Sequence, residues 1–191
     1  MTTTRSWRTT SKNMTESANL RSRLSLGPRR KAREFALLGV YESLINESAD
    51  FAAIDANLLS VITDEGSPVA GCDLSSEDFD HCDQEFYRDI LDGVIKGKGE
   101  LLETLSRHLD RDPQRLSVVE RACLMIGTWE MKNCPQIPYR VVINEAVELC
   151  KVFGADRGYK LVNGVLDKVA SELRPAEHEL SLIHISEPTR P

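Results

Sequence analysis

The stretch from Ile137 to Pro175 constrains the fold of this 191-residue chain more than any other. Pro138 suits the first turn of a helix, because its missing N–H would have no partner there. Gly154 is typical of a left-handed cap, and Pro175 follows the end of a second helix. Two blocks of apolar residues recur at helical spacing, Val142, Ala146, Leu149 and Phe153, then Leu161, Val162, Val165, Leu166 and Val169. The pattern predicts a helical hairpin that must bury two apolar faces.

A strongly apolar helix is also predicted from about Arg30 to Ile45, with little polar surface beyond Glu34 and Glu42. A helix that is apolar nearly all round lies in the centre of a fold. Its first turn is nevertheless basic, with the sequence RRKAR at 29–33. Cations at a helix N-terminus oppose the helix dipole, so stability alone would favour acids there. The mismatch indicates a binding role for this end of the helix, with a solvated basic flank as the alternative.

The middle of the chain carries further helix signals. Apolar residues from Phe86 to Leu109 mark one or two helices, and Gly97 and Gly99 are expected to separate or bend them. Ser117 and Glu120 have the spacing of a capping box, directly before an apolar run that continues to about Lys132. Gly127, inside that run, costs a helix roughly 1 kcal/mol relative to alanine, which predicts a close helix crossing at this point.

Charge is segregated along the chain, although the formal net charge is −6. Residues 1–33 carry nine Lys and Arg against one acid, and residues 46–92 carry thirteen acids against one base. Residues 1–28 are predicted to be a disordered leader, and about 60–85 to be an acidic, mobile loop insertion. The final residues, SLIHISEPTRP, resemble a vector-encoded peptide, so 178–191 are set aside as a tail.

Nothing in the sequence points to catalysis. It contains no phosphate-binding loop, dinucleotide turn, nucleophile elbow or HExxH helix, and no histidine falls in a motif of a general base. Five dispersed cysteines favour a reducing cytoplasm over a disulfide framework, and the segment Cys72 to Cys82 lacks tetrahedral zinc spacing. No apolar run approaches the ~20 residues of a membrane span. We expect no enzyme activity, no metal and no cofactor.

Several motifs together resemble one family. These are RRKAREFALLGVYE from Arg29, VVERACLMIGTWEM from Val118, then VVINEAVEL, FGAD, KLVNGVLDKVA and a terminal LRP, and they span Arg29 to Glu177. In this order they resemble the NusB transcription antitermination family. The resemblance implies an all-α fold with two three-helix subdomains packed at a steep angle, and one RNA- and protein-binding domain over residues 29–177.

The resemblance also implies an RNA surface. In the family, the basic start of the first helix contacts a single-stranded RNA element called boxA, and this carries over to Arg29, Arg30, Lys31 and Arg33. Tyr41 matches a family tyrosine that would stack on a base, with a buried ring as the alternative. Lys160 matches a lysine beside the RNA surface, with a solvated helix start as the alternative. The chain departs from the family at 157–161, where Leu161 replaces a phenylalanine and Tyr159 would substitute for its stacking.

The remaining matched positions concern partners and packing. Glu120 matches a position that docks the partner, a small ribosomal protein acting as NusE, although its capping box explains it equally well. Asn144 and Asn163 are interpreted as buried amides that tie the hairpin together, with Gly164 permitting close approach. The implied function is a bacterial, cytoplasmic factor that binds boxA RNA with NusE and, with other Nus factors, helps RNA polymerase resist termination, notably in ribosomal RNA transcription. The alternatives are the RNA-binding domain of a truncated rRNA cytosine methyltransferase and a purely protein-binding helical module.

Overall fold

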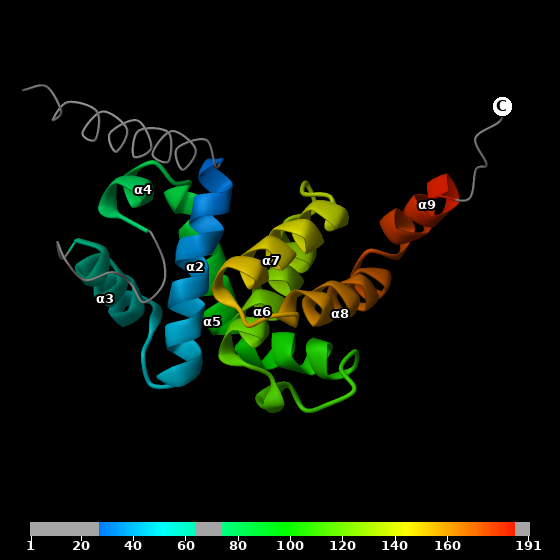
Figure 1. Cartoon of the computed structure of the whole chain (residues 1–191), viewed down its shortest axis with the longest axis horizontal. Coiled ribbons are helices and arrows are strands. Elements are labelled where there is room, and N and C mark those ends of the chain that lie inside the picture. The colour runs from blue at the N-terminus through cyan, green and yellow to red at the C-terminus, as the bar shows by residue number, and fades with distance from the viewer. Residues whose placement is uncertain (1–26, 64–73, 186–191) are drawn as a thin grey trace, which may run out of the picture.

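A computed structural model describes residues 27–63 and 74–185 of the protein (Figure 1). Within these ranges the regular structure is entirely helical, which confirms the predicted all-α fold. The elements are α2 (Pro28–Ile45), α3 (Phe51–Thr63), α4 (Ser76–Asp80), α5 (Gln84–Ser106), the 3₁₀ helix η1 (Pro113–Arg115), α6 (Val118–Asn133), α7 (Tyr139–Phe153), α8 (Gly158–Leu173) and α9 (Pro175–Ile185). No helix in the described ranges is long and apolar enough to cross a membrane.

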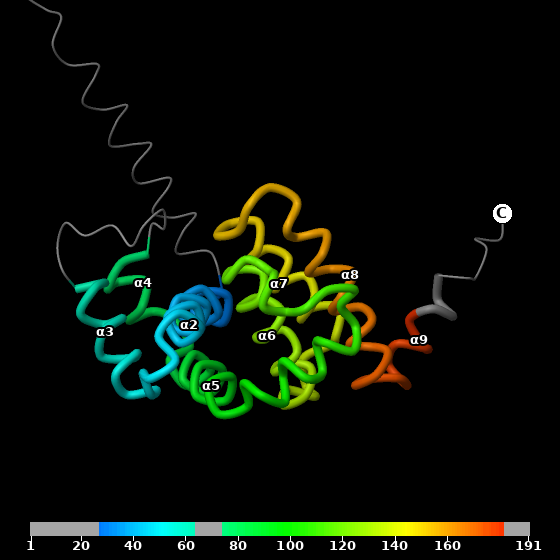
Figure 2. The backbone as a smooth tube through the Cα atoms, turned by 90° about the horizontal axis from the view of Figure 1, so that it is seen from below, coloured from blue at the N-terminus to red at the C-terminus, as the bar shows by residue number. Residues whose placement is uncertain are grey.

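The helices form two groups that meet along α2, α5 and α6. In the first group α2 packs on α3 and α5, and in the second α6, α7 and α8 pack on one another. Contacts of α6 with both α5 and α2 join the groups. Figure 2 shows α3 and α4 on one side of α2, and α6, α7 and α8 on the other. α8 runs across the direction of α2 in Figure 1, as the family resemblance implies for two three-helix subdomains.

The acidic segment is more ordered than its composition predicts. Residues 64–73 lie outside the described part, but α4 and the start of α5 fall inside the range expected to be a loop. Ser75 and Asp78 form a capping box at the start of α4. Phe79 is buried and stacks edge-on against Phe35, with ring centroids 5.0 Å apart. This single aromatic side chain ties the acidic segment to the core, which outweighs the loop-like composition around it.

The capping box predicted for α6 is confirmed. Ser117 Oγ accepts from the Glu120 N–H at 3.2 Å, and Glu120 Oε2 accepts from the Ser117 N–H at 3.0 Å. The close crossing predicted at Gly127 is confirmed as well, because a Cβ there would lie 2.7 Å from Cδ1 of Leu166 on α8. By contrast, α5 is one continuous helix through both Gly97 and Gly99.

The turn between α7 and α8 differs from the prediction. Gly154 has an extended backbone, with φ −94° and ψ 173°, and is not a left-handed cap. The left-handed residue is Arg157, with φ 72°, immediately before α8. It is the one non-glycine residue with positive φ in the described chain. The left-handed residue therefore lies three residues after the glycine at which it was predicted.

The LRP motif has a structural role at the end of α8. The Arg174 guanidinium donates to the main-chain carbonyls of Met131, Cys134 and Ile137, each at 2.8 Å. Two of these carbonyls belong to the last turn and cap of α6, where helix carbonyls have no intrahelical partner. Arg174 therefore closes the C-terminal end of α6 from a position more than 40 residues further along the chain.

The predicted boundaries of the domain are shifted at both ends. Pro28 is the first residue of α2, so it belongs to the folded domain, while residues 1–26 lie outside the described part. The helix α9 continues to Ile185, beyond the boundary expected at 177. Ser181 accepts a hydrogen bond from Arg140 at its carbonyl, at 3.3 Å, so the beginning of the predicted tail packs against α7.

Candidate nucleic-acid interface

The basic start of α2 is exposed at Arg29 and half-buried at Arg30. The helix has no acid in its first turn and no side-chain cap at Gly27, as the sequence shows. The Arg29 side chain is 53% exposed, with Nε 3.3 Å from Asp83 Oδ2. Its guanidinium also lies over the Phe86 ring, 5.1 Å from the centroid. Arg29 is thus accessible to a ligand while a cation–π contact holds it in place.

Arg33 does not belong to this exposed surface, which corrects the prediction made for it. Its side chain is 5% exposed, and its Nε and Nη2 each donate to a carboxylate oxygen of Glu130 at 2.8 Å. Glu130 lies on α6 and is 1% exposed. The pair is a bidentate ion pair inside the protein, because the fork of the guanidinium matches the two oxygens of the carboxylate. Arg33 therefore joins the two helix groups.

Lys31 is also turned away from solvent. Its Nζ lies 2.9 Å from Glu34 Oε2 and 3.9 Å from Asp78 Oδ1, and all three side chains are buried or nearly so. Two of the four cations predicted to face RNA thus hold the fold together. The dipole mismatch that pointed to binding is explained at these two positions by nearby acids, Glu34 on α2 itself for Lys31 and Glu130 on α6 for Arg33.

A chain of contacts leads from α2 across α7 to the start of α8. Arg30 Nη2 lies 3.5 Å from Glu148 Oε2, and Lys151 donates to the other oxygen of Glu148 at 2.7 Å. The Lys151 ammonium in turn lies over the Tyr159 ring, 5.5 Å from its centroid. The structure therefore places Arg30 and Tyr159, predicted from motifs that are more than 120 residues apart, on one surface.

Lys151 is a member of this surface that sequence reasoning missed. It lies between the two predicted groups, is 46% exposed, and brings a cation to the ring expected to stack. The spacing of Glu148 and Lys151 in one helix is visible in the sequence and predicts their pairing. Their position beside Arg30 depends on the packing of α2 against α7, which no local pattern reveals.

Tyr41 lies further along α2 and is exposed. Its side chain is 39% exposed and its hydroxyl forms no hydrogen bond within the described residues, which excludes the alternative of a buried ring. Eleven residues separate it from Arg30, or about 16 Å along the helix axis. The same spacing returns Tyr41 to nearly the same face of α2, since it corresponds to about three full turns.

Lys160 and Glu120 occupy other sides of the same region. Lys160 is exposed on α8, where it borders a hollow with residues of the α5–η1 connection. The Glu120 carboxylate is held by its capping box. It also lies close to Gly158, since a Cβ added to Gly158 would be 2.8 Å from Glu120 Oε1. The structural role expected of Glu120 is therefore confirmed, and it also fits the start of α8 against α6.

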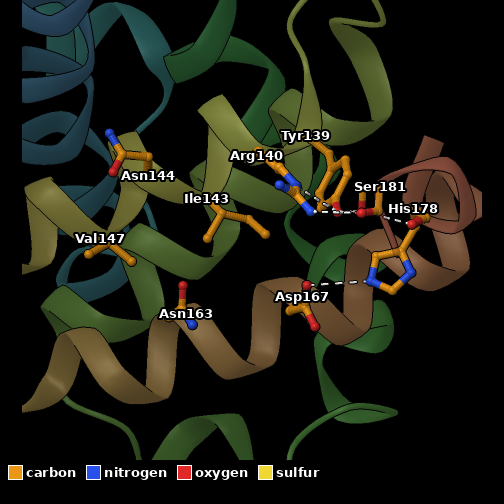
Figure 3. A pocket seen from close by; sticks show the side chains of 9 residues that line it. All are labelled: Tyr139, Arg140, Ile143, Asn144, Val147, Asn163, Asp167, His178 and Ser181. Atoms are coloured by element: carbon orange, nitrogen blue, oxygen red, sulfur yellow. Dashed lines mark hydrogen bonds and ion pairs between the residues drawn. The ribbon is translucent and has the colours of Figure 1, made fainter. Parts of the chain in front are cut away.

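Asn144 and Asn163 are not buried, contrary to the prediction. Both side chains are exposed and line a groove of about 370 Å³ between α7 and α8, which Ile143 and Val147 also border (Figure 3). Gly164 has open space around it and mediates no close approach. Asn144 and Asn163 are exposed because they lie on the outer face of the α7–α8 hairpin, although their amide groups could have formed hydrogen bonds inside it.

The cysteines in the described residues are buried free thiols. Burial raises the pKa of Cys82 to about 11, with Asp83 adding to the effect. Burial also raises the pKa of Cys134. Cys82 and Cys134 therefore stay protonated at neutral pH and act as small apolar side chains. In the described ranges no group of three or more His, Cys, Asp or Glu side chains is placed to hold a metal ion.

The sequence and fold are those of a known helical family. The family model described as "NusB family" matches residues 30–171, and the chain therefore belongs to the NusB family. The protein named "Transcription antitermination protein NusB" of Burkholderia lata is 45% identical over 149 residues, which cover 78% of this chain and 92% of the relative. Its counterpart in Cupriavidus pinatubonensis is 42% identical over 149 residues, covering 78% and 80%.

A solved structure supports the same assignment. The structure of T. maritima NusB matches with a TM-score of 0.62 at 27% identity, covering 80% of this chain and 97% of that one. These relatives are named as transcription antitermination proteins and not as enzymes, in agreement with the function expected from the sequence. They are bacterial proteins.

Proposed function

We propose that this protein is a transcription antitermination factor that binds boxA RNA together with the small ribosomal protein NusE, in the bacterial cytoplasm. Through other Nus factors it would help RNA polymerase resist termination, notably during transcription of ribosomal RNA. The observation that carries the proposal is the continuous surface from Arg30 through Lys151 to Tyr159. It combines guanidinium, ammonium and an aromatic ring, the groups that recognise single-stranded RNA.

The residues on this surface would contact different parts of the RNA. Arg29 and Arg30 would contact phosphates, which supply most of the affinity for RNA. Tyr159 would stack on an unpaired base, and Lys151 would hold the ring while neutralising a nearby phosphate. Tyr41 would offer a second stacking face about 16 Å further along α2. Lys31 and Arg33 would support this surface from inside the fold without contacting RNA.

RNA binding would compete with acids of the protein itself. Asp83 pairs with Arg29, while Glu145 and Glu148 pair with Arg30. A phosphate must displace these partners or share the cations with them, so binding by this protein alone should be weak and sensitive to salt. NusE, docking near Glu120, would tighten binding by extending the contacted surface.

The proposal is tested by titrating the full chain into labelled boxA RNA and a scrambled RNA of equal length, with and without NusE. Fluorescence anisotropy should show tighter binding to boxA, with the preference enlarged by NusE. The Arg30→Ala/Lys151→Ala variant should bind less tightly, and the slope of log K against log salt should fall by about 0.7 per lost single-strand phosphate contact. Lys96→Ala is the matched control, because Lys96 is exposed on α5 and its one ion-pair partner among the described residues is Asp92.

Two results would contradict the proposal. Equal binding to boxA and scrambled RNA in the presence of NusE would favour a module that binds only protein. An unchanged salt slope in the Arg30→Ala/Lys151→Ala variant would exclude that surface as the RNA site, even if the protein binds boxA elsewhere.

A further inference from the structure

A basic hollow lies beside the surface just described, on the other flank of α8. It encloses about 260 Å³ between α8 and the connection from α5 to η1. Lys160 and Lys168 border it from α8, and Arg111 borders it from the connection. The spacing of the two lysines, eight residues, places them about 12 Å apart along one side of the helix.

The three cations of the hollow differ from those at the start of α2 in having no acidic partner. Arg111, Lys160 and Lys168 are exposed, and none of them forms an ion pair with any residue that the structure describes. At the start of α2, by contrast, every cation from Arg29 to Arg33 has a carboxylate within 4 Å. Unpaired cations have more to gain from an incoming anion, because no internal partner must be displaced.

The acids near the hollow leave its positive charge largely intact. Asp110 is the one acid in its lining. Glu172, on the next turns of α8, accepts from Arg107 Nη2 and from His108 Nε2, each at 2.6 Å. The Arg107 guanidinium, followed by His108, holds the pKa of Glu172 below its usual range. Its negative charge is thus already balanced by its own partners.

The wall of the hollow also suits a nucleotide. Leu161 and Val165 give it an apolar side, and Gly164 leaves its centre open, since a Cβ there would meet nothing within 4 Å. A small apolar wall flanked by cations is able to receive both a phosphate and the face of a sugar or base. Lys160 directly follows Tyr159 in the first turn of α8, so the hollow adjoins the surface that contains Tyr159.

We propose that this hollow, with Arg111 and Lys168 as its new contact residues, binds two phosphates of the RNA strand after the strand passes over the start of α8. The inference rests on the proposed function, and extends the RNA footprint beyond Tyr159. Because its cations are unpaired, the hollow supplies more of the salt-dependent affinity than the arginines of α2 do.

The test measures RNA affinity of the full chain by fluorescence anisotropy over a range of salt concentrations. The Arg111→Ala/Lys168→Ala variant should bind boxA RNA at least roughly tenfold less tightly, given two lost charge-assisted contacts. Its salt slope should fall by about 1.4, which corresponds to two single-strand phosphate contacts. The conservative variant Arg111→Lys/Lys168→Arg should retain the slope, and Lys96→Ala should behave as wild type. Circular dichroism should show an unchanged fold, because the altered side chains are exposed.

A titration with inorganic phosphate distinguishes RNA from a free anion as the ligand. We expect only weak shifts of the Gly164 and Lys168 amide resonances with millimolar phosphate, and larger shifts with RNA. Shifts with phosphate but none with RNA would overturn the inference, as would a salt slope left unchanged by Arg111→Ala/Lys168→Ala.

The two proposals fail in different ways. If hollow variants bind normally while Arg30→Ala/Lys151→Ala binds poorly, the hollow is excluded and the proposed function stands. If the wild type does not prefer boxA to scrambled RNA, the proposed function fails. The salt slopes still decide the role of the hollow in that case, since phosphate contacts do not depend on base sequence.

Discussion

The buried pair of Arg33 and Glu130 makes the sharpest prediction about stability. Replacing Arg33 with alanine leaves the Glu130 carboxylate unpaired at 1% exposure and removes two hydrogen bonds of 2.8 Å. Breaking one side of a buried ion pair typically costs about 3–5 kcal/mol of the free energy of unfolding. A domain of this size has roughly 5–15 kcal/mol in total, so the loss should be plain in a urea unfolding curve.

A double replacement separates the charge from the packing. In Arg33→Met/Glu130→Leu no charge is buried and the volume is approximately kept, so stability should return to within about 1–2 kcal/mol of wild type. A double-mutant cycle with Arg33→Ala and Glu130→Ala then measures the coupling directly. Because neither side chain faces the proposed RNA surface, the double variant should keep its affinity for boxA RNA.

The cost of Arg33→Ala should also depend on pH. In the wild type, burial raises the pKa of Glu130, and the Arg33 guanidinium opposes that rise. Without the guanidinium the pKa of folded Glu130 rises further above its unfolded value. A carboxyl group with a raised folded pKa destabilises the fold increasingly as pH climbs past the unfolded value, so the deficit should shrink as pH is lowered from 7 towards 5.

Either of two results would contradict a buried ion pair between Arg33 and Glu130. If Arg33→Ala costs less than about 1 kcal/mol, the pair is not the buried ion pair described. If Arg33→Met/Glu130→Leu is folded and stable but no longer binds boxA RNA, Arg33 contacts RNA after all, and the correction made from its burial is wrong.

Further predictions concern single positions. Gly127→Ala should destabilise by about 1–3 kcal/mol in urea unfolding, because its Cβ would meet buried Leu166 at 2.7 Å, whereas Gly164→Ala, with open space, should stabilise by up to about 1 kcal/mol. Arg157→Gly should raise the melting temperature and stabilise by about 1 kcal/mol, since φ is 72°. Glu172→Gln should be less stable than wild type at pH 7. A carboxyl group with a lowered pKa stabilises the fold only while it is ionised, so the difference in stability should vanish as pH falls through the lowered pKa of Glu172. A difference in stability that persists in acid would contradict the pairing.

Local patterns predicted the long helices α2, α5, α6, α7 and α8 and the capping box of α6 because their causes are local, whereas the left-handed cap predicted at Gly154 was wrong. Apolar spacing places the helices, and the Ser117–Glu120 box lies within one turn, so four residues of sequence are enough to identify it. The predicted crossing at Gly127 also followed from one position, since a glycine inside a helix costs stability that a close helix contact can offset, although Gly164 has no such contact. The all-α fold followed from these features together with the family motifs.

The errors arose where the environment is set by distant parts of the chain. Arg33 pairs with a residue 97 positions away, and nothing near it in sequence distinguishes it from exposed Arg29. Asn144 and Asn163 share helices with core residues, yet they lie on the outer face. Phe79 orders a segment whose composition predicts a loop, because Phe35 and Tyr87 receive its ring. In each case tertiary packing outweighs local composition.

Arg174 determines where the chain can safely be shortened. The family match ends at residue 171, which suggests a convenient place to truncate a recombinant fragment. A fragment cut there would lack the guanidinium that donates to the carbonyls of Met131, Cys134 and Ile137, and α6 would end on unpartnered acceptors. Since α6 carries Glu130, loosening its last turn would also disturb the ion pair that joins the two helix groups. A fragment for biophysical work should therefore extend at least through Arg174.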